Sequence, residues 1–539
     1  MQRRRLIVAC TSLLTAVLLS WLMARALAPG GWTLAKAAIM GSFGLASLWV
    51  GMCLTNGAIG YLMAPWAETP GARLRSDGAA PIAIAVTIRD ENMEIAIPPL
   101  RRLLDALDAT GNGHRFTVFM LSDSTDASEE PAIAAFQAAY PNRVRYRRRA
   151  DNAGFKAGNI MDFLDHRADG FESMLVLDAD SEMSAKAVLR LAHEMDHNPH
   201  LAIVQHLTVG LPAASAFPRL FQFGMRAGMR TWATALAWWQ GDECCYWGHN
   251  AMVRIAPFRD HCRLPLLPNG RPILSHDQVE AALLAGAGWG VRLLPEEDGS
   301  FEANPPALPE FMRRELRWLA GNLEYRHLFG MSGLRPMGRW QLLQAILLFG
   351  CMPFYLAILA GAAVAAVTDT VSPFPAGRVL AVMLAWAGAI YAPKLLGYSQ
   401  ILVRPAPYGG RAQVLAGIAA ETVFTLLLDA ISVVSKTGTT VRLLLGMRPA
   451  WLPQNRADRG VAWAEAARLL WPHTMLGLLA FAAFASAGWH TVLWALPLAG
   501  GLPLAIPFCV LTAHPGFSAW LRRRRIAATP EELWPDPRP

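Results

Sequence analysis

The stretch LVLDADSEMS, residues 175–184, leads from an apolar run directly into two carboxylates. Leu175, Val176 and Leu177 have the composition of a buried strand. Asp178 and Asp180 follow on the turn that leaves this strand, where both can face one crevice. Adjacent carboxylates repel each other unless a cation lies between them, and Mg²⁺ or Mn²⁺ prefers carboxylates together with phosphate oxygens. The stretch therefore predicts a strand that ends in a divalent-metal site, although a solvated Asx-turn also fits the pair taken alone.

Strand and helix patterns alternate around this stretch. Apolar runs predict strands, and leucines spaced three and four residues apart predict helices. Such an alternation is typical of a mostly parallel sheet with helices on both faces. The predicted strands cover residues 82–88, 115–123, 143–149 and 173–180, and the predicted helices cover residues 98–110, 129–140 and 157–168.

Acidic residues stand at the ends of three of these strands. Asp90 and Glu91 follow the first strand, Asp123 ends the second, and Asp178 and Asp180 end the fourth. Ligands of open α/β sheets bind beyond the carboxyl ends of the strands. We therefore expect these acids to converge on one crevice.

The composition of the whole chain indicates a membrane protein. Of its 539 residues 53% are hydrophobic and only 17% are charged, and the mean hydropathy is +0.27. Soluble globular proteins carry about 25% charged residues. Much of the net charge of +8 lies at residues 3–5 and 522–525. These arginines indicate membrane topology, and because aromatic residues do not interleave with a basic patch, we expect no nucleic-acid partner.

Apolar segments flank a charge-rich region in the middle of the chain. They cover residues 6–28, 37–63, 340–367, 379–403, 412–434, 469–487 and 491–512. The terminal arginine runs place both ends of the chain in the cytoplasm, so an even number of segments crosses. Residues 412–434 contain Glu421 and Asp429, which are costly in hydrocarbon. We therefore expect this segment to lie in the interface and six others to span, with eight spans as the alternative.

These segments divide the chain into four predicted parts. Two transmembrane helices occupy residues 1–68, and a cytoplasmic domain occupies residues 69–335. A second membrane region, residues 336–515, contains the interfacial helix and a basic cytoplasmic loop at residues 435–462. Residues 516–539 form a basic cytoplasmic tail.

Three further motifs follow LVLDADSEMS in order: YWGHNAMVR at residues 246–254, ILSHDQVEAALL at 273–284 and RRELRWLAGNL at 313–323. Together they resemble the processive family 2 glycosyltransferases, most of all the glucans biosynthesis glucosyltransferase H family of Gram-negative inner membranes, and more distantly bacterial cellulose synthase. The resemblance implies a GT-A-like (Rossmann-like) cytoplasmic α/β domain inserted between transmembrane helices. It also implies an inverting enzyme that polymerises glucose from UDP-glucose into the β-linked backbone of osmoregulated periplasmic glucans.

The resemblance implies roles on the donor side of the reaction. Asp90, Glu91 and Asp123 would lie near the nucleotide, with Asp123 on the uracil side. Lys156 would lie near the diphosphate. The remaining implied donor and metal residues are Arg314, at the position of the glutamine of the QxxRW motif, and the pair Asp178 and Asp180, which would bind Mg²⁺ or Mn²⁺.

On the acceptor side the resemblance implies that Asp277, in the sequence SHD, is the general base. Arg317 would neutralise the leaving group, and Trp318 would line the acceptor site. Because sugars present apolar faces, tryptophans also make suitable platforms. The remaining candidate acceptor residues are Trp239, Trp247, His249 and Asn250. The implied partners are UDP-glucose, the growing glucan, the lipid bilayer and a periplasmic glucan-modifying protein.

Structural explanations compete with two of these roles. Ser275 and Gln278 match a capping box, so Asp277 could be only an acid of a first helical turn. Arg317 and Trp318 could be an anchor pair at a membrane interface. At the level of the whole chain, the alternatives are a non-processive enzyme that glycosylates a lipid and a transport or scaffold protein without catalysis.

Other patterns in the chain resemble metal and nucleotide motifs. HEMDH at residues 193–197 matches the zinc protease pattern, but Pro199 should end its helix. GAGWG at residues 286–290 follows a helix, whereas a dinucleotide loop follows a strand. A zinc site remains an alternative for Cys244, Cys245 and Cys262 with His249 and His261, although their spacing contains no C-x-x-C pair.

Overall fold

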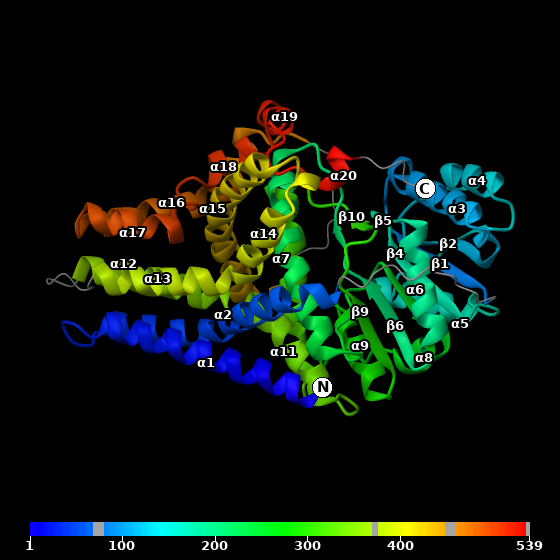
Figure 1. Ribbon diagram of the computed structural model, residues 1–539, viewed down its shortest axis with the longest axis horizontal. Coiled ribbons are helices and arrows are strands. Elements are labelled where there is room, and N and C mark those ends of the chain that lie inside the picture. Colours follow the sequence, from blue (N-terminus) through cyan, green and yellow to red (C-terminus); the bar gives the residue numbers. More distant parts are fainter. Residues whose placement is uncertain (68–79, 369–375, 448–458, 535–539) are drawn as a thin grey trace.

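The computed structural model describes residues 1–67, 80–368, 376–447 and 459–534. An α/β domain forms one end of the molecule and long apolar helices form the other (Figure 1). The predicted boundary at residue 68 and the central part of the predicted basic loop lie outside the described residues. The described part of the α/β domain begins at residue 80.

A seven-stranded sheet forms the centre of this domain. Its strands have the order β3-β2-β1-β4-β8-β6-β9, and all pairs are parallel except those that β8 makes with β4 and β6. The predicted mostly parallel sheet is confirmed, and the four predicted strands correspond to β1 to β4. The strands are β1 (Ile82–Ile88), β2 (Phe116–Ser122), β3 (Val144–Arg148), β4 (Ser173–Asp178), β6 (Leu201–His206), β8 (Ala251–Arg254) and β9 (Gly290–Leu294).

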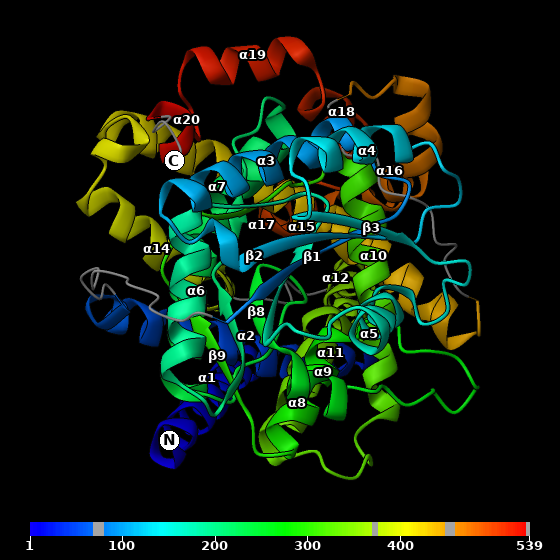
Figure 2. The same cartoon turned by 90° about the vertical axis from the view of Figure 1, so that its right-hand side faces the viewer.

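Helices cover both faces of the sheet, as Figure 2 shows for α3 and α4 on one side and α5, α8 and α9 on the other. Alternate residues of β1 explain this arrangement. Ile84 and Val86 pack in the core under α3 and α6, whereas Ala83 and Ala85 face the core that contains Phe163 of α5. The helices are α3 (Met93–Ala109), α4 (Glu130–Ala139), α5 (Phe155–His166), α6 (Ala185–His197), α8 (Ile255–His261) and α9 (Asp277–Gly286).

A small second sheet lies beside the carboxyl end of β4. Its order is β5 (Ser181–Met183), β10 (Ser300–Glu302), β7 (Val209–Gly210). β10 runs antiparallel to β5, and this register pairs Glu302 with Ser181. The pairing brings a glutamate from far along the chain next to the Asp178–Asp180 turn.

Two helices connect the α/β domain to the helical region. α7 (Ala216–Gln240) lies between the two halves in Figure 1 and packs against α2, α14 and α15. α10 (Leu308–Glu324) packs against α11 and α15. Phe217 of α7 and Phe311 of α10 share one buried cluster with Phe424 of α15. The two halves are therefore joined by a continuous apolar core.

Five helices, or six if one bent pair is counted as a single span, are long and apolar enough to cross a membrane within the described residues. The single helices are α1 (Gln2–Leu27), α2 (Leu34–Ala67), the combined α11 (Pro336–Gly350) and α12 (Met352–Thr368), α15 (Arg411–Leu444) and α16 (Trp463–Ser486). The bent pair is α13 (Ala376–Ile390) and α14 (Ala392–Val403), with an angle of 70°.

The set of candidate spans differs from the predicted set at two places. Residues 491–512 form two short helices, α17 (Trp489–Ala499) and α18 (Ala505–Thr512), since the chain breaks at Gly500 and Gly501. The predicted interfacial segment instead belongs to α15, which is 34 residues long. Its acids are paired within the protein, because Glu421 contacts Lys394 and Asp429 accepts from Tyr391. Whether α15 crosses the bilayer or lies at its surface stays a prediction.

Candidate active site

Lys156 connects the turn after β4 with the loop before β8. Its Nζ contacts Oδ1 of Asp178 and donates a hydrogen bond to the carbonyl oxygen of Gly248 at 2.7 Å. Lys156 reaches this position because the backbone before α5 turns sharply, with positive φ at Gly154 and Phe155. The lysine therefore brings two sequence motifs, LVLDADSEMS and YWGHNAMVR, into contact.

Gly248 also lies against the predicted base. Its φ is +89°, a conformation that favours glycine, and a Cβ built there would lie 3.3 Å from Cβ of Asp277 and 3.5 Å from its Oδ2. A side chain at this position would occupy the space beside the carboxylate. Asp178, Lys156, Gly248 and Asp277 thus form one contiguous group of residues.

Asp277 is the first residue of α9, and its surroundings differ from the capping box suggested by the sequence. Among the described residues, the N-cap residue His276 makes no side-chain cap hydrogen bond. Ser275 instead faces α10, where its Oγ lies 2.1 Å from a Cβ built at Gly321. The capping-box interpretation is therefore wrong, because tertiary packing against α10 turns Ser275 away from the helix end.

The electrostatic environment raises the pKa of Asp277. Burial is the largest cause, and Glu280 adds to it, while His276 and Lys156 act in the opposite direction. His276 is itself held by Glu280, with 2.9 Å between Nδ1 and Oε1. A carboxylate with a raised pKa is a stronger base, which suits a group that accepts a proton.

Glu302 joins the acidic group although no motif marks it in the sequence. Burial raises its pKa, and the carboxylates of Asp180 and Asp178 add to the rise, while His249 and Arg314 oppose it. Oε2 of Glu302 lies 3.4 Å from Nε2 of His249. These interactions locate Glu302 beside Asp178 and Asp180, the predicted metal-binding acids. Only the pairing of β10 with β5 reveals this, since the two strands are far apart in the chain.

The acids around the Asp178–Asp180 turn fit a hard divalent cation. Within the described ranges no three His, Cys, Asp or Glu side chains form a group that could hold a metal by themselves. The protein would therefore supply Asp178 and Asp180, leaving the other positions to phosphate oxygens and water, as is usual for Mg²⁺. The contact between Lys156 and Asp178 shows that a positive charge is accommodated there.

The nucleotide-side acids are held by hydrogen bonds at the ends of β1 and β2. Asp90 has φ 55° and accepts from the backbone N–H of Thr125 at 2.7 Å. The Asp123 carboxylate binds Arg149 through two nitrogens, at 2.8 and 2.7 Å. Arg149 also donates to the carbonyl of Phe155, the residue before Lys156, at 3.1 Å. Arg149 thus links Asp123 to the backbone next to Lys156, whereas Asp90 is held by Thr125, and half-buried Glu91 follows Asp90.

The basic and aromatic residues of the RELRW sequence lie on α10. The guanidinium of Arg314 lies 4.6 Å from the ring centroid of Trp318, whose side chain is 44% exposed. Arg314, Arg317 and Trp318 are three and four residues apart and so share one side of the helix. Arg314 interacts electrostatically with Glu302, which places this side of α10 toward the acidic group.

Of the other four predicted acceptor residues, two lie away from the candidate site and two lie beside it. Trp239 is only 2% exposed and donates its indole N–H to Asn56 of α2 at 3.0 Å, so it packs between helices. Asn250 is fully buried and donates to the carbonyl of Phe301 at 3.1 Å, which corrects its expected acceptor role to one of anchoring β10. Half-buried Trp247 and His249 flank Gly248 and stay beside the site.

The competing motifs do not form sites of their own. α6 ends at His197, two residues before Pro199, as the sequence predicted. Residues 286–290 join the end of α9 to β9. The three cysteines of the possible zinc site are buried free thiols, and within the described part of the chain they belong to no group of three metal-ligating side chains.

Comparison with known proteins now identifies the family. Residues 174–393 match the family described as Glycosyl transferase family group 2. The glucans biosynthesis glucosyltransferase H of Rhodopseudomonas palustris is 32% identical over 99% of this chain and 78% of the relative. The chain belongs to the glucans biosynthesis glucosyltransferase H family. The enzyme of the same name from Xylella fastidiosa is 31% identical over 96% of this chain and 87% of its own length.

Solved structures show more distant likeness to this family member. A mannosyltransferase from Pyrobaculum calidifontis in complex with GDP-Man and Mn²⁺ is 15% identical, covers 68% of this chain and 97% of its own, and has a TM-score of 0.45. S. aureus TarS 1–349 with UDP-GlcNAc covers 59% of this chain and 91% of its own, with 14% identity and a TM-score of 0.32. The family 2 match and the mixed α/β sheet establish a glycosyltransferase with a GT-A-like domain.

Proposed function

We propose that this glucosyltransferase H family member polymerises glucose from UDP-glucose into a β-glucan backbone, with inversion at the anomeric carbon. The observation that carries the proposal is the bridge made by Lys156, which contacts Asp178 on one side and the carbonyl of Gly248, next to Asp277, on the other. An inverting transfer needs a leaving diphosphate and a base at opposite sides of one sugar. The bridge joins the candidate residues for these two tasks.

On the donor side, the proposed role of Asp178 and Asp180 is to hold Mg²⁺ or Mn²⁺ with the diphosphate. The bound cation would supply positive charge to the leaving group. Lys156 and Arg317 would add further positive charge, which stabilises the developing diphosphate in a site shielded from water. Asp90, Glu91 and Asp123 would line the nucleotide pocket, with Arg149 fixing the position of Asp123.

On the acceptor side, Asp277 would take the proton from the hydroxyl of the terminal glucose. The acceptor oxygen then bonds to C1 of the donor glucose, and the bond from C1 to the diphosphate oxygen breaks, so that UDP leaves with the electron pair. Positioned base catalysis contributes roughly 10²–10⁴-fold. Exposed Trp318, beside Arg314, offers the apolar platform for the acceptor sugar.

Purified protein tests this proposal directly. With UDP-glucose and Mg²⁺ or Mn²⁺ we expect a glucose polymer with β-linkages, and no polymer after chelation of the metal. UDP-galactose, UDP-N-acetylglucosamine and GDP-mannose serve as matched donors. Efficient transfer from any of these in place of UDP-glucose would contradict the assigned donor, and linkage analysis of the product would reveal any α-linkage.

The alternatives predict different products. A non-processive lipid glycosyltransferase adds one sugar to a lipid, so the size of the labelled product separates it from a polymerase. A transport or scaffold protein without catalysis predicts no release of UDP, and no change when Asp277 is replaced by asparagine.

We further propose an inner-membrane location with the catalytic domain and both termini in the cytoplasm, and passage of the glucan through the helical region to a periplasmic glucan-modifying protein. The charged terminal arginines support this orientation. Polar groups within the helical region support a path, since Tyr391 at the α13–α14 bend donates to Asp429 at 2.7 Å. Sealed vesicles with the catalytic domain outside should trap labelled polymer in the lumen. Polymer that stays entirely outside would contradict passage.

A further inference from the structure

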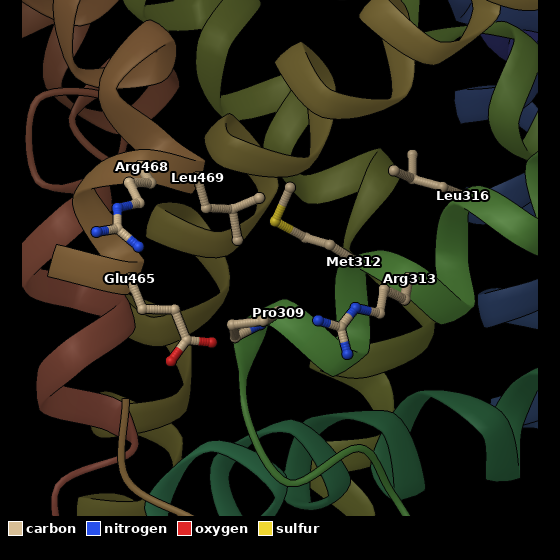
Figure 3. Close-up of a pocket in the computed structure, with 7 residues that line it drawn as sticks. All are labelled: Pro309, Met312, Arg313, Leu316, Glu465, Arg468 and Leu469. Atoms are coloured by element: carbon tan, nitrogen blue, oxygen red, sulfur yellow. The ribbon is translucent and has the colours of Figure 1, made fainter. Parts of the chain in front are cut away.

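A groove separates α10 from the start of α16, on the far side of α10 from Arg314 and Trp318. It has a volume of about 370 Å³. The residues of α10 that line the groove are spaced three and four apart, so they form one face of that helix. Figure 3 shows Met312 and Leu469 facing each other across it. The lining residues are Pro309, Met312, Arg313, Leu316, Glu465, Arg468 and Leu469.

Three arginines and two glutamates lie at the groove, which leaves one net positive charge. Arg459 holds both nearby acids, donating to Glu310 at 2.8 Å and to Glu465 at 2.7 Å. Arg313 is 3.7 Å from the already paired Glu310, and its side chain is 50% exposed. Exposed Arg468 makes no ion pair with any part of the chain that the structure describes. The mouth of the groove therefore carries unneutralised positive charge.

Exposed apolar side chains also lie elsewhere on α16. Leu469 lines the groove, whereas Leu478 and Leu479, which are 52% and 65% exposed, lie further along on other sides of the helix. Trp463 and Trp471 are 58% and 59% exposed, and exposed tryptophans at the start of an apolar helix are typical of a membrane interface. α16 is also one of the helices that can span a membrane. The groove thus opens where headgroups and acyl chains of a bilayer would meet the protein.

We propose that this groove binds a bilayer phospholipid with an anionic headgroup. Arg313 and Arg468 would hold the phosphate group, because a guanidinium group can donate two parallel hydrogen bonds to phosphate oxygens. Met312, Leu316 and Leu469 would contact the first part of an acyl chain. A free phosphate ion would contact only the arginines, whereas a phospholipid would contact both the arginines and the apolar lining.

Native mass spectrometry of the full chain, without donor sugar, tests lipid binding separately from catalysis. The protein is placed in mixed micelles that contain phosphatidylglycerol and phosphatidylcholine. The wild type should retain phosphatidylglycerol selectively. The double variant Arg313→Glu/Arg468→Glu should retain it roughly 25-fold less, from roughly fivefold for each arginine. The double variant Arg167→Glu/Arg271→Glu changes two exposed arginines of the α/β domain by the same charge and should retain the lipid as the wild type does.

Three outcomes would overturn the proposal. The first is that the groove variant and the control variant retain equal amounts of phosphatidylglycerol, and the second is that the wild type retains phosphatidylglycerol and phosphatidylcholine equally. The third is that millimolar inorganic phosphate displaces the lipid. The variant Leu469→Trp fills the apolar part of the groove without a change of charge. It should also reduce retention, and unchanged retention would contradict the acyl-chain contact. Thermal unfolding of each variant shows whether it is folded, so that loss of lipid is read only from folded protein.

Discussion

The proposed donor half and the proposed acceptor half of the candidate active site are built in different ways. The donor half comes from the ends of β1, β2 and β4 and the turn before α5, all within one run of alternating strands and helices. The acceptor half combines the loop before β8, the start of α9 and one side of α10. The first half is a property of a local repeating pattern, whereas the second exists only when distant segments pack together.

The two halves also differ in how their acids are balanced. Asp123 is paired with Arg149, and Asp178 with Lys156, so the donor half holds its charges in ion pairs. In the acceptor half Asp277 is buried near the carboxylate of Glu280, and its pKa is raised. The donor half is thus arranged to bind charge, and the acceptor half to accept a proton. The following experiments test this division.

The largest expected effect comes from removing one acid from each half. Asp180→Asn and Asp277→Asn should each abolish glucose transfer, with a loss of about 10³-fold or more, while both proteins stay folded. The variants should differ in donor binding. Asp277→Asn should bind UDP and metal as the wild type does, because it lacks only the base, whereas Asp180→Asn should bind them weakly. Calorimetry with UDP and Mn²⁺ measures the difference, and equal binding by both variants would contradict the division.

A smaller loss is expected from Gly248→Ala, which touches the junction between the halves. The added methyl group would lie 3.3 Å from Cβ of Asp277 and should displace the carboxylate. A contact this short requires a shift of a few tenths of an ångström, so we expect a loss in kcat smaller than the roughly 10²-fold that a misplacement of about 1 Å costs. Gly288→Ala is the matched control, since its φ of +97° imposes similar backbone strain and no described atom lies within 4 Å of the added group. Both variants should lose about 1–2 kcal/mol of stability, and only Gly248→Ala should lose activity.

Glu302→Gln tests whether this unmarked residue serves the metal site. Removing its charge from beside Asp178 and Asp180 should weaken the apparent metal affinity about 10-fold, with a smaller change in kcat at saturating metal. Glu182→Gln on the neighbouring strand β5 is the control, because Glu182 is paired with Arg102 instead. A metal titration of transfer activity measures the effect. Identical curves for Glu302→Gln and the wild type would limit Glu302 to a structural role.

The pH dependence should report the raised pKa of Asp277. A base works only when deprotonated, so kcat/KM should fall as the pH falls through its pKa, and by at most tenfold per pH unit below it. Because burial and Glu280 raise this pKa, the fall should begin above the range of a solvent-exposed aspartate. A profile that stays flat until the pH reaches the ordinary aspartate range would argue against Asp277 as the base.

The sequence predicted the strands of the donor half well because their pattern is local. Alternating apolar runs and leucine spacing gave β1 to β4 to within two residues, and the acids at their ends followed from strand direction. The motif resemblance identified Asp277 and Trp318 as candidates. Trp239 and Asn250 only pack in the core, but tryptophan and asparagine are also residue types that bind sugars. The sequence therefore could not show that these two residues lie outside the site.

Tertiary packing determined the features that the sequence did not predict. Glu302 reaches Asp178 and Asp180 only through the register of β10 against β5, which no local pattern encodes. Ser275 turns toward α10 instead of capping α9, and the apolar run at residues 491–512 breaks into two helices. Local periodicity fixes which residues share a face of a strand or helix. Contacts between elements far apart in the chain, such as that of Lys156 with Gly248, arise only when whole elements pack, because their energy depends on complete surfaces and not on neighbouring residues.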